Sequence, residues 1–444
     1  MDTLIQIAQL LLMLSILVIL HEFGHYITAK MFKVRVEKFY LFMDAGFSLF
    51  KKKIGETEWG LGWLPLGGYV KLSGMIDESM DTDQMKTDPQ PWEFRSKPAW
   101  QRLIIMLGGI IVNILLAWLI YTTMYSTYGK KYISTEMMQK DGLTFGEVGQ
   151  KVGFKDGDKV LSVDGKYQPR FDRMLLDILL GDDIVVERGG QKVDIHLSDA
   201  DKKEILEKEG RDFIHAKVDK SVIDSIAPES NALKAGLKKG DTIVGVNGAK
   251  LKYLSQLSEA AFKNKEKHIT LNLIRGNKAV DVPVNVNKEG IIGLVQRSTD
   301  TTNYVVTEHY NFFSAMPKAM EESYNQIVYN VKQFKLILRP STGAYKQVTS
   351  VVGIASKLPT TWNWEFFWTF TALFSVGLAF MNILPIPGLD GGHAIFTIAE
   401  MVTGRKLSDK AAGVVQTVGM VILLTLMALV FGKDIYQIIE RKFF

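Results

Sequence analysis

Apolar residues are concentrated in four stretches, two near each end of the chain. Each stretch is about as long as a helix that crosses a hydrocarbon core of roughly 30 Å. We therefore expect a polytopic α-helical membrane protein with about four spans, at residues 4–20, 103–121, 366–386 and 411–431. The first stretch lacks a basic leader and a small-residue cleavage site, so we expect it to remain in the mature protein.

The polar region between the second and third stretches contains an internal repeat. Residues 153–166 (GFKDGDKVLSVDGK) and 236–250 (GLKKGDTIVGVNGAK) share a glycine-aspartate turn, a β-branched strand and a hairpin turn. The second copy resembles the core of PDZ domains, which bind extended peptides by strand addition. We expect two PDZ-like α+β domains, over residues 127–220 and 221–300. The alternative is a pair of inert β-rich domains left by duplication.

Three further segments have patterns of their own. Residues 310–338, within the linker region 301–345, show helical spacing of apolar residues, which predicts a helix on the membrane surface or packed on the spans. Residues 57–72 predict a β-hairpin that is too short and too broken to span. Residues 76–97 are polar with two prolines and predict a loop whose role stays open. The membrane core would then comprise residues 1–126 and 346–444.

Charge and cysteine content narrow the possible functions. Basic residues follow the first stretch and separate the last two, which favours both termini outside the cytoplasm; Lys130 and Lys131 argue weakly against this. The net charge of +5 lies at membrane flanks and requires no nucleic acid partner. The absence of cysteine excludes disulfides and thiolate metal sites. Any metal must therefore be held by histidines and carboxylates.

The end of the first stretch carries the strongest chemical signal, His21-Glu22-Phe23-Gly24-His25. On a helix, positions i and i+4 share one face, so His21 and His25 can hold one zinc ion while Glu22 reaches its water. A chance match is the alternative. Two unpartnered imidazoles and a carboxylate at membrane depth would be costly, however, and a bound metal removes that cost.

Hydrolytic zinc sites use three protein ligands and an open position, so a third ligand is expected at similar depth. Asp390 fits, because it follows Asn382-Ile383-Leu384-Pro385-Ile386-Pro387-Gly388-Leu389, a run that must break the third span. Broken backbone at membrane depth is tolerated where it is buried in protein or lines a wet cavity. His393 is the competing third ligand.

HExxH in a first span, NxxPxPxLDGG in a later one and PDZ-like modules between them resemble the site-2 protease family, and within it the bacterial sigma-E-regulating members. The resemblance implies that His21, His25 and Asp390 bind zinc, that Glu22 is the general base and that Asn382 hydrogen-bonds substrate backbone. It also implies that residues 57–72 dip into the membrane and hold the substrate as an added strand. The modules would face the periplasm of a bacterial inner membrane.

Asn113 matches the family's G-P-x-x-N pattern in the second span, although Ile110 replaces the proline. The resemblance implies that Asn113 lines the active site and contacts substrate. The alternative is close helix packing at Gly108 and Gly109, with Asn113 bonding a neighbouring helix. The implied activity is zinc-dependent endoproteolysis of single-span membrane proteins, such as anti-sigma factors and signal-peptide remnants, after periplasmic trimming. The alternative hypotheses are a non-catalytic membrane scaffold and a metal transporter. The sequence does not indicate an oligomeric state.

Overall fold

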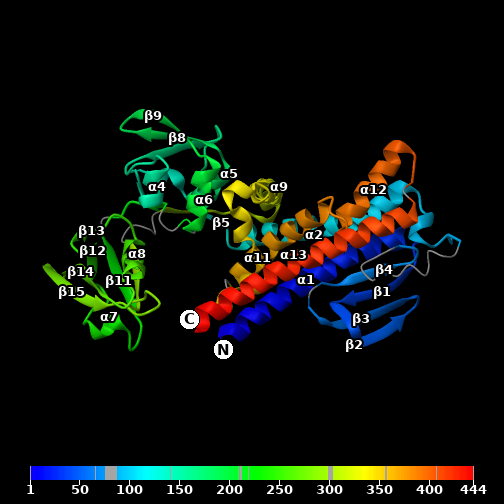
Figure 1. Cartoon of the computed structure of the whole chain (residues 1–444), viewed down its shortest axis with the longest axis horizontal. Helices are drawn as coiled ribbons and strands as arrows, with labels where there is room; N and C mark the ends of the chain where they lie inside the picture. The colour runs from blue at the N-terminus through cyan, green and yellow to red at the C-terminus, as the bar shows by residue number, and fades with distance from the viewer. Residues whose placement is uncertain are drawn as a thin grey trace. The chain divides into compact units, whose positions relative to one another are not determined.

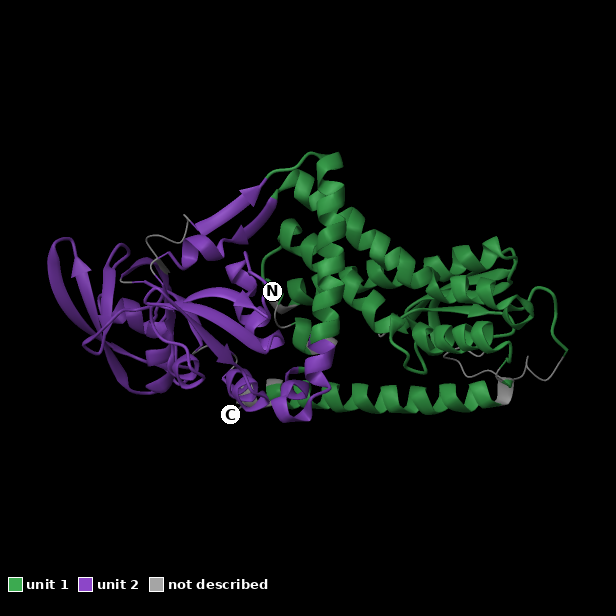
Figure 2. Ribbon diagram, turned by 90° about the horizontal axis from the view of Figure 1, so that it is seen from above, with its two compact units in different colours: residues 1–129, 309–332, 348–444 green, residues 130–308, 333–347 purple. Residues whose placement is uncertain are grey.

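The computed structural model describes the chain from residue 2 to residue 443, apart from residues 66, 76–87, 141, 209, 211–212, 219, 299–303, 356–357 and 407. Most of the predicted loop 76–97 therefore lies outside the described residues. The chain forms two compact units, which Figure 2 colours separately. Unit 1 comprises residues 1–129, 309–332 and 348–444, and unit 2 comprises residues 130–308 and 333–347.

Within the described residues, unit 1 contains four helices that are long and apolar enough to cross a membrane, as the sequence predicts. They are α1 Asp2–Met31, α2 Ala99–Thr127, α11 Trp364–Ile383 and α13 Asp409–Phe443 (Figure 1). Helix α2 packs against α1, against α11 and against the shorter α12, Asp390–Thr403. The third helix ends before the predicted residue 386 because Pro385 and Pro387 have no N–H to continue it.

A four-stranded sheet lies between α1 and α2 in the chain. Its strands are β1 Val36–Leu41, β2 Met43–Ile54, β3 Thr57–Leu64 and β4 Tyr69–Leu72, in the order β2-β3-β1-β4. Strand β1 pairs parallel with β3 and antiparallel with β4, so β3 and β4 are not neighbours.

The predicted hairpin 57–72 is therefore wrong in its pairing. Two strands, β3 and β4, are present in that range, but β1 lies between them. Strand β1 occupies this central position with its side chains Val36, Phe39 and Tyr40 buried. The hairpin of this sheet joins β2 and β3 through a tight turn in which Gly55 has φ +62°. Residues 51–53 of β2 are lysines, which explains why the sequence did not predict this strand.

Unit 2 contains two modules, one for each copy of the repeat, which share the series strand, helix, strand, helix and three strands. The first module has an additional helix before its last strand, and the second has an additional short strand before its second helix. The first has β6 Leu143–Phe145, α4 Glu147–Lys151, β7 Lys159–Val163, α5 Met174–Leu180, β8 Asp183–Arg188, β9 Gln191–His196, α6 Asp199–Glu207 and β10 Ile214–Ala216. The second has β11 Ser221–Ile226, α7 Asn231–Lys234, β12 Thr242–Val246, β13 Ala249–Lys250, α8 Gln256–Lys263, β14 His268–Arg275, β15 Lys278–Asn285 and β16 Leu294–Ser298. Each module has its own hydrophobic core, drawn from residues 143–213 and 223–292.

The glycine-aspartate turns of the repeat are closed by the same contacts in both modules. Arg188 donates to both oxygens of Asp158, at 2.8 and 2.7 Å, and Arg275 donates to both oxygens of Asp241, at 2.8 and 2.6 Å. Each aspartate also accepts the backbone N–H three residues earlier, at 2.9 Å. Because both aspartates are buried and held by these contacts, the repeated sequence is a structural turn.

The remaining elements connect or cap the larger ones. They are β5 Lys130–Ile133, β17 Val305–Glu308, α3 Thr135–Met138, α9 Phe312–Ile337, α10 Val351–Ala355 and 3₁₀ turns at Phe94–Ser96, Phe171–Arg173, Pro340–Thr342 and Ala344–Gln347. Strands β5 and β17 pair antiparallel, with Ile133 opposite Val305.

Helix α9 packs on the spans, which is one of the two arrangements that its sequence pattern allows. Its buried residues are the small Ala315, Ala319 and Ser323 and the polar Glu322 and Gln326. Trp118 Nε1 of α2 donates to the Met316 carbonyl at 2.9 Å. Aromatic residues point outward, and Phe313 is 80% exposed. Exposed aromatic residues and small residues at the packed face suit a helix whose outer face contacts lipid.

Candidate metal centre

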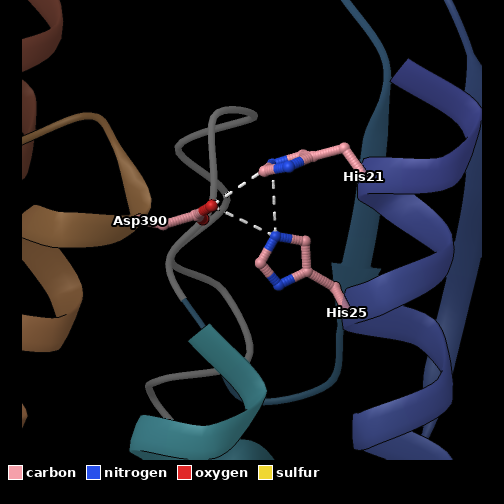
Figure 3. A group of neighbouring side chains, drawn as sticks. All are labelled: His21, His25 and Asp390. Atoms are coloured by element: carbon pink, nitrogen blue, oxygen red, sulfur yellow. Dashed lines mark hydrogen bonds and ion pairs between the residues drawn. The ribbon is translucent and has the colours of Figure 1, made fainter. Parts of the chain in front are cut away.

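Three ligand atoms from distant parts of the chain converge in unit 1 (Figure 3). His21 and His25 lie one turn apart on α1, and Asp390 is the first residue of α12. The two Nε2 atoms are 3.4 Å apart, and each lies 3.2 Å from Asp390 Oδ2. Both imidazoles are buried. Among the described residues, no other group of histidines and carboxylates converges in this way.

These distances fit a zinc ion. A tetrahedral site with metal–ligand distances of about 2.0–2.1 Å has ligand–ligand distances of about 3.3–3.4 Å. The donor chemistry agrees with this geometry. The Ile105 carbonyl lies 2.8 Å from His25 Nδ1, so Nδ1 carries the proton and Nε2 presents a lone pair toward the carboxylate. Converging lone pairs are repulsive without a cation between them.

The break between α11 and α12 brings Asp390 to this centre. Helix α11 ends at Ile383, and Gly388 takes the positive φ of +100° that turns the chain. The glycines after Asp390 pack directly on this connection: a Cβ at Gly391 would overlap the Leu384 carbonyl, and one at Gly392 would lie 2.6 Å from the Ile386 carbonyl. The Gly-Gly pair therefore allows α12 to begin tightly against the broken segment.

His393, the competing third ligand, is not part of the converging group. Its Nε2 lies 2.9 Å from Gln416 Nε2 on α13. The structure thus brings together His21, His25 and Asp390 and directs His393 toward another helix.

Glu22 lies beside the first ligand and is partly buried. Its carboxylate accepts the backbone N–H of Val70, in the edge strand β4. Gly68, just before that strand, also approaches Glu22, since a Cβ at Gly68 would lie 3.5 Å from Glu22 Cγ. The Glu22 side chain, which projects from α1, therefore packs against the β4 edge of the sheet.

The two asparagines singled out from the sequence both contact His21. Asn382 Nδ2 lies 3.3 Å from His21 Nε2, the nitrogen that faces the other ligands. Asn113 Nδ2 lies 3.1 Å from His21 Nδ1, on the opposite edge of the ring, and Asn113 is fully buried. The position of Asn113 favours the alternative of a bond to a neighbouring helix.

The close helix packing at Gly108 and Gly109 that the sequence offered as an alternative is present, but the contact of Gly109 with the ligand rings was not predicted. A Cβ at Gly108 would lie 2.6 Å from the Gly24 carbonyl, so small residues allow the close crossing. A Cβ at Gly109 would lie 2.5 Å from His25 Nε2 and 2.6 Å from His21 Cε1. The signal was Gly24, inside the HExxH sequence itself, together with the Gly108-Gly109 pair.

Replacing Gly109 with Ala is expected to lower zinc affinity at least about 10-fold, because the new methyl group would displace the imidazoles. Zinc binding to the purified chain, measured by competition with a chelator, checks this. Gly377→Ala on α11 is the matched control, because a Cβ there meets nothing within 4 Å. Equal zinc affinity of the two variants would contradict the expectation.

Comparison with known proteins also indicates a zinc-dependent protease. A family model described as peptidase family M50 matches residues 9–426. The regulator of sigma-E protease RseP of Escherichia coli is 26% identical over 463 residues, covering 96% of this chain and 98% of that protein. A Vibrio cholerae protein provisionally named a zinc metalloprotease is 27% identical over 457 residues, covering 95% and 96% of the two chains.

Proposed function

The chain belongs to peptidase family M50, and from that premise we propose that this multi-pass zinc metalloprotease cuts single-span membrane proteins within the bilayer. One observation carries the proposal. The ligand histidines lie on α1, and Asn382 lies on α11, both helices able to cross a membrane. The third ligand begins α12, after the broken segment that follows α11. A hydrolytic centre assembled from such helices is accessible to peptide bonds at membrane depth.

The proposed mechanism is metal-assisted peptide hydrolysis. Bound zinc supplies a Lewis acid and lowers the pKa of its water. Glu22 accepts a proton from the attacking water and passes it to the leaving amine, while the Val70 N–H keeps the carboxylate oriented. Asn382 directs its amide to the side of His21 that faces the ligands, where it can donate to the substrate backbone.

The substrate helix must unwind before it is cut, because its backbone groups are paired within the helix. We propose that the free edge of β4 receives the unwound segment as an added strand. The Val70 N–H contact links this edge to Glu22, so a strand added there would run past the base. This assigns the substrate-holding role to one strand of the predicted range 57–72.

We propose that the two modules of unit 2 are PDZ-like domains in the bacterial periplasm that gate access to the site. The connections are short: β5 begins at Lys130, shortly after α2 ends at Thr127, and β17 ends at Glu308, shortly before α9 begins at Phe312. Folded modules on such short connections would obstruct a bulky substrate ectodomain. The proposed substrates are therefore anti-sigma factors and signal-peptide remnants already trimmed on the periplasmic side.

The rival role of the modules is recruitment of the new substrate C-terminus at the turn from Gly236 to Asp241. Asp241 fills this turn with a buried carboxylate paired to Arg275, which disfavours a second carboxylate there. Strand β16 lies at the edge of its sheet and is the better position for an extended peptide.

Excision of the modules tests the gate. Ile133 and Val305 are paired residues of β5 and β17, so residues 134–304 can be replaced by a short glycine linker that closes this ribbon. In cells, the intact enzyme is expected to cut a single-span substrate with a short ectodomain and to ignore the same substrate with its full ectodomain. The excised variant is expected to cut both.

The excised variant carrying Glu22→Gln controls for other proteases, and expression of each variant is measured alongside. Loss of short-substrate cleavage in the well-expressed excised variant, with the full-length substrate still uncut, would favour recruitment over gating. Failure of the intact enzyme to cut any single-span substrate would contradict the proposed function itself.

A further inference from the structure

Residues on one face of α2 contact the two ligand histidines. Ile105, Gly109 and Asn113 follow one another at intervals of four residues, so they lie along one stripe of the helix. All three meet the zinc ligands: the Ile105 carbonyl contacts His25, Asn113 contacts His21, and Gly109 lies against both rings. We propose that Asn113 is a positioning residue whose side-chain oxygen accepts the Nδ1–H of His21 and holds Nε2 toward the metal.

The contact between the Ile105 carbonyl and His25 shows how such a neighbour fixes the protonation of a ligand histidine. A carbonyl oxygen can only accept, so the Ile105 carbonyl places the proton of His25 on Nδ1. The unprotonated Nε2 is then available as a ligand. Metal-binding histidines almost always donate their second ring nitrogen to such an acceptor, which fixes both the tautomer and the orientation of the ring.

His21 needs the same arrangement. Its Nε2 is the nitrogen that faces His25 and Asp390, so Nδ1 must carry the proton when Nε2 binds the metal. Nδ1 lies 3.1 Å from the Asn113 amide, within hydrogen-bond distance. The oxygen and nitrogen of an amide have nearly the same shape, and their assignment follows from the hydrogen-bond network. A donor at Nδ1 requires the Asn113 oxygen in that position.

Within the described chain, the surroundings of Asn113 offer its amide no partner other than His21. Its side chain is fully buried, and within the described chain its second amide atom has no hydrogen-bond partner. The contact with His21 is therefore the interaction that accounts for a polar side chain in this apolar helix. Ser375 of α11 donates to the Asn113 backbone carbonyl at 2.7 Å, which holds the residue in place.

Asn382 provides the contrast. It approaches the other nitrogen of the same ring, on the side where ligands and substrate meet. Asn113 should therefore affect how tightly the metal is held, and Asn382 should affect turnover.

The test measures zinc affinity of the purified full-length protein, by competition with a chelating dye, for wild type, Asn113→Ala, Asn113→Asp and Asn382→Ala. Asn113→Ala is expected to weaken zinc binding about 10- to 100-fold, the range typical of lost support to a ligand. Asn113→Asp should restore affinity to within a few-fold of wild type, because a carboxylate accepts the same Nδ1–H. Asn382→Ala should bind zinc like wild type.

Unchanged zinc affinity in Asn113→Ala would overturn the proposal. Zinc binding as weak in Asn113→Asp as in the alanine variant would also overturn it, because the amide would then be acting as a donor. If the alanine variant does not fold, the aspartate variant still decides the question. Zinc affinity is measured without any substrate. The result therefore tests this inference separately from the proposed function.

Discussion

Replacing Glu22 with Gln is expected to abolish cleavage while one zinc ion stays bound per chain. Glutamine keeps the shape of the side chain but cannot accept a proton, whereas the three converging ligand atoms are unaffected. General acid–base catalysis contributes about 10²- to 10⁴-fold to a rate, so turnover should fall by at least that range. Zinc content and cleavage rate are measured on the same preparation.

Glu321→Gln is the matched control for this variant, because it makes the same chemical change at an exposed position on α9. It is expected to cleave like wild type. Turnover by Glu22→Gln at the rate of Glu321→Gln would remove Glu22 from the mechanism. Loss of zinc from Glu22→Gln would instead show that Glu22 supports the metal.

Replacing Asp390 with Ala is expected to remove both zinc and activity. Two imidazoles alone make a poor site, so affinity should fall by more than the roughly 10- to 100-fold expected from losing a supporting residue. Metal content after dialysis against a weak chelator measures this.

His393→Ala is the control, since His393 lies three residues further along α12 and is directed to Gln416. It is expected to keep its zinc. A zinc-free His393→Ala protein together with a zinc-bound Asp390→Ala protein would reverse the assignment of the third ligand.

The convergence of His21, His25 and Asp390 was predictable because each of these residues has a local signal. The spacing of His21 and His25 places two imidazoles on one helix face. Prolines and glycines identify a broken span, and Asp390 is the carboxylate beside that break. The four apolar stretches were predictable for the same reason, since length and hydropathy alone define them.

The support of this centre depends on which residues meet where α1 and α2 cross. The Gly108-Gly109 pair indicates a close crossing but does not identify those contacts. The Ile105 carbonyl is a backbone group whose role is independent of its side chain, and the position of Gly109 becomes critical only where α2 meets α1. The order of the small sheet was mispredicted because β1 enters between β3 and β4. Pairing of sequential strands is a tendency, and burial of the β1 side chains outweighed it.

The position of the scissile bond tests the central claim most directly. Wild type and Glu22→Gln are reconstituted in lipid with a single-span substrate that has a short ectodomain, and the products are mapped by mass spectrometry. The predicted result is a cut inside the hydrophobic span that appears with wild type, disappears on zinc chelation and is absent with Glu22→Gln. Cleavage only in the polar flanks of the substrate, or cleavage that persists in the Glu22→Gln sample, would contradict intramembrane proteolysis at the His21, His25 and Asp390 centre.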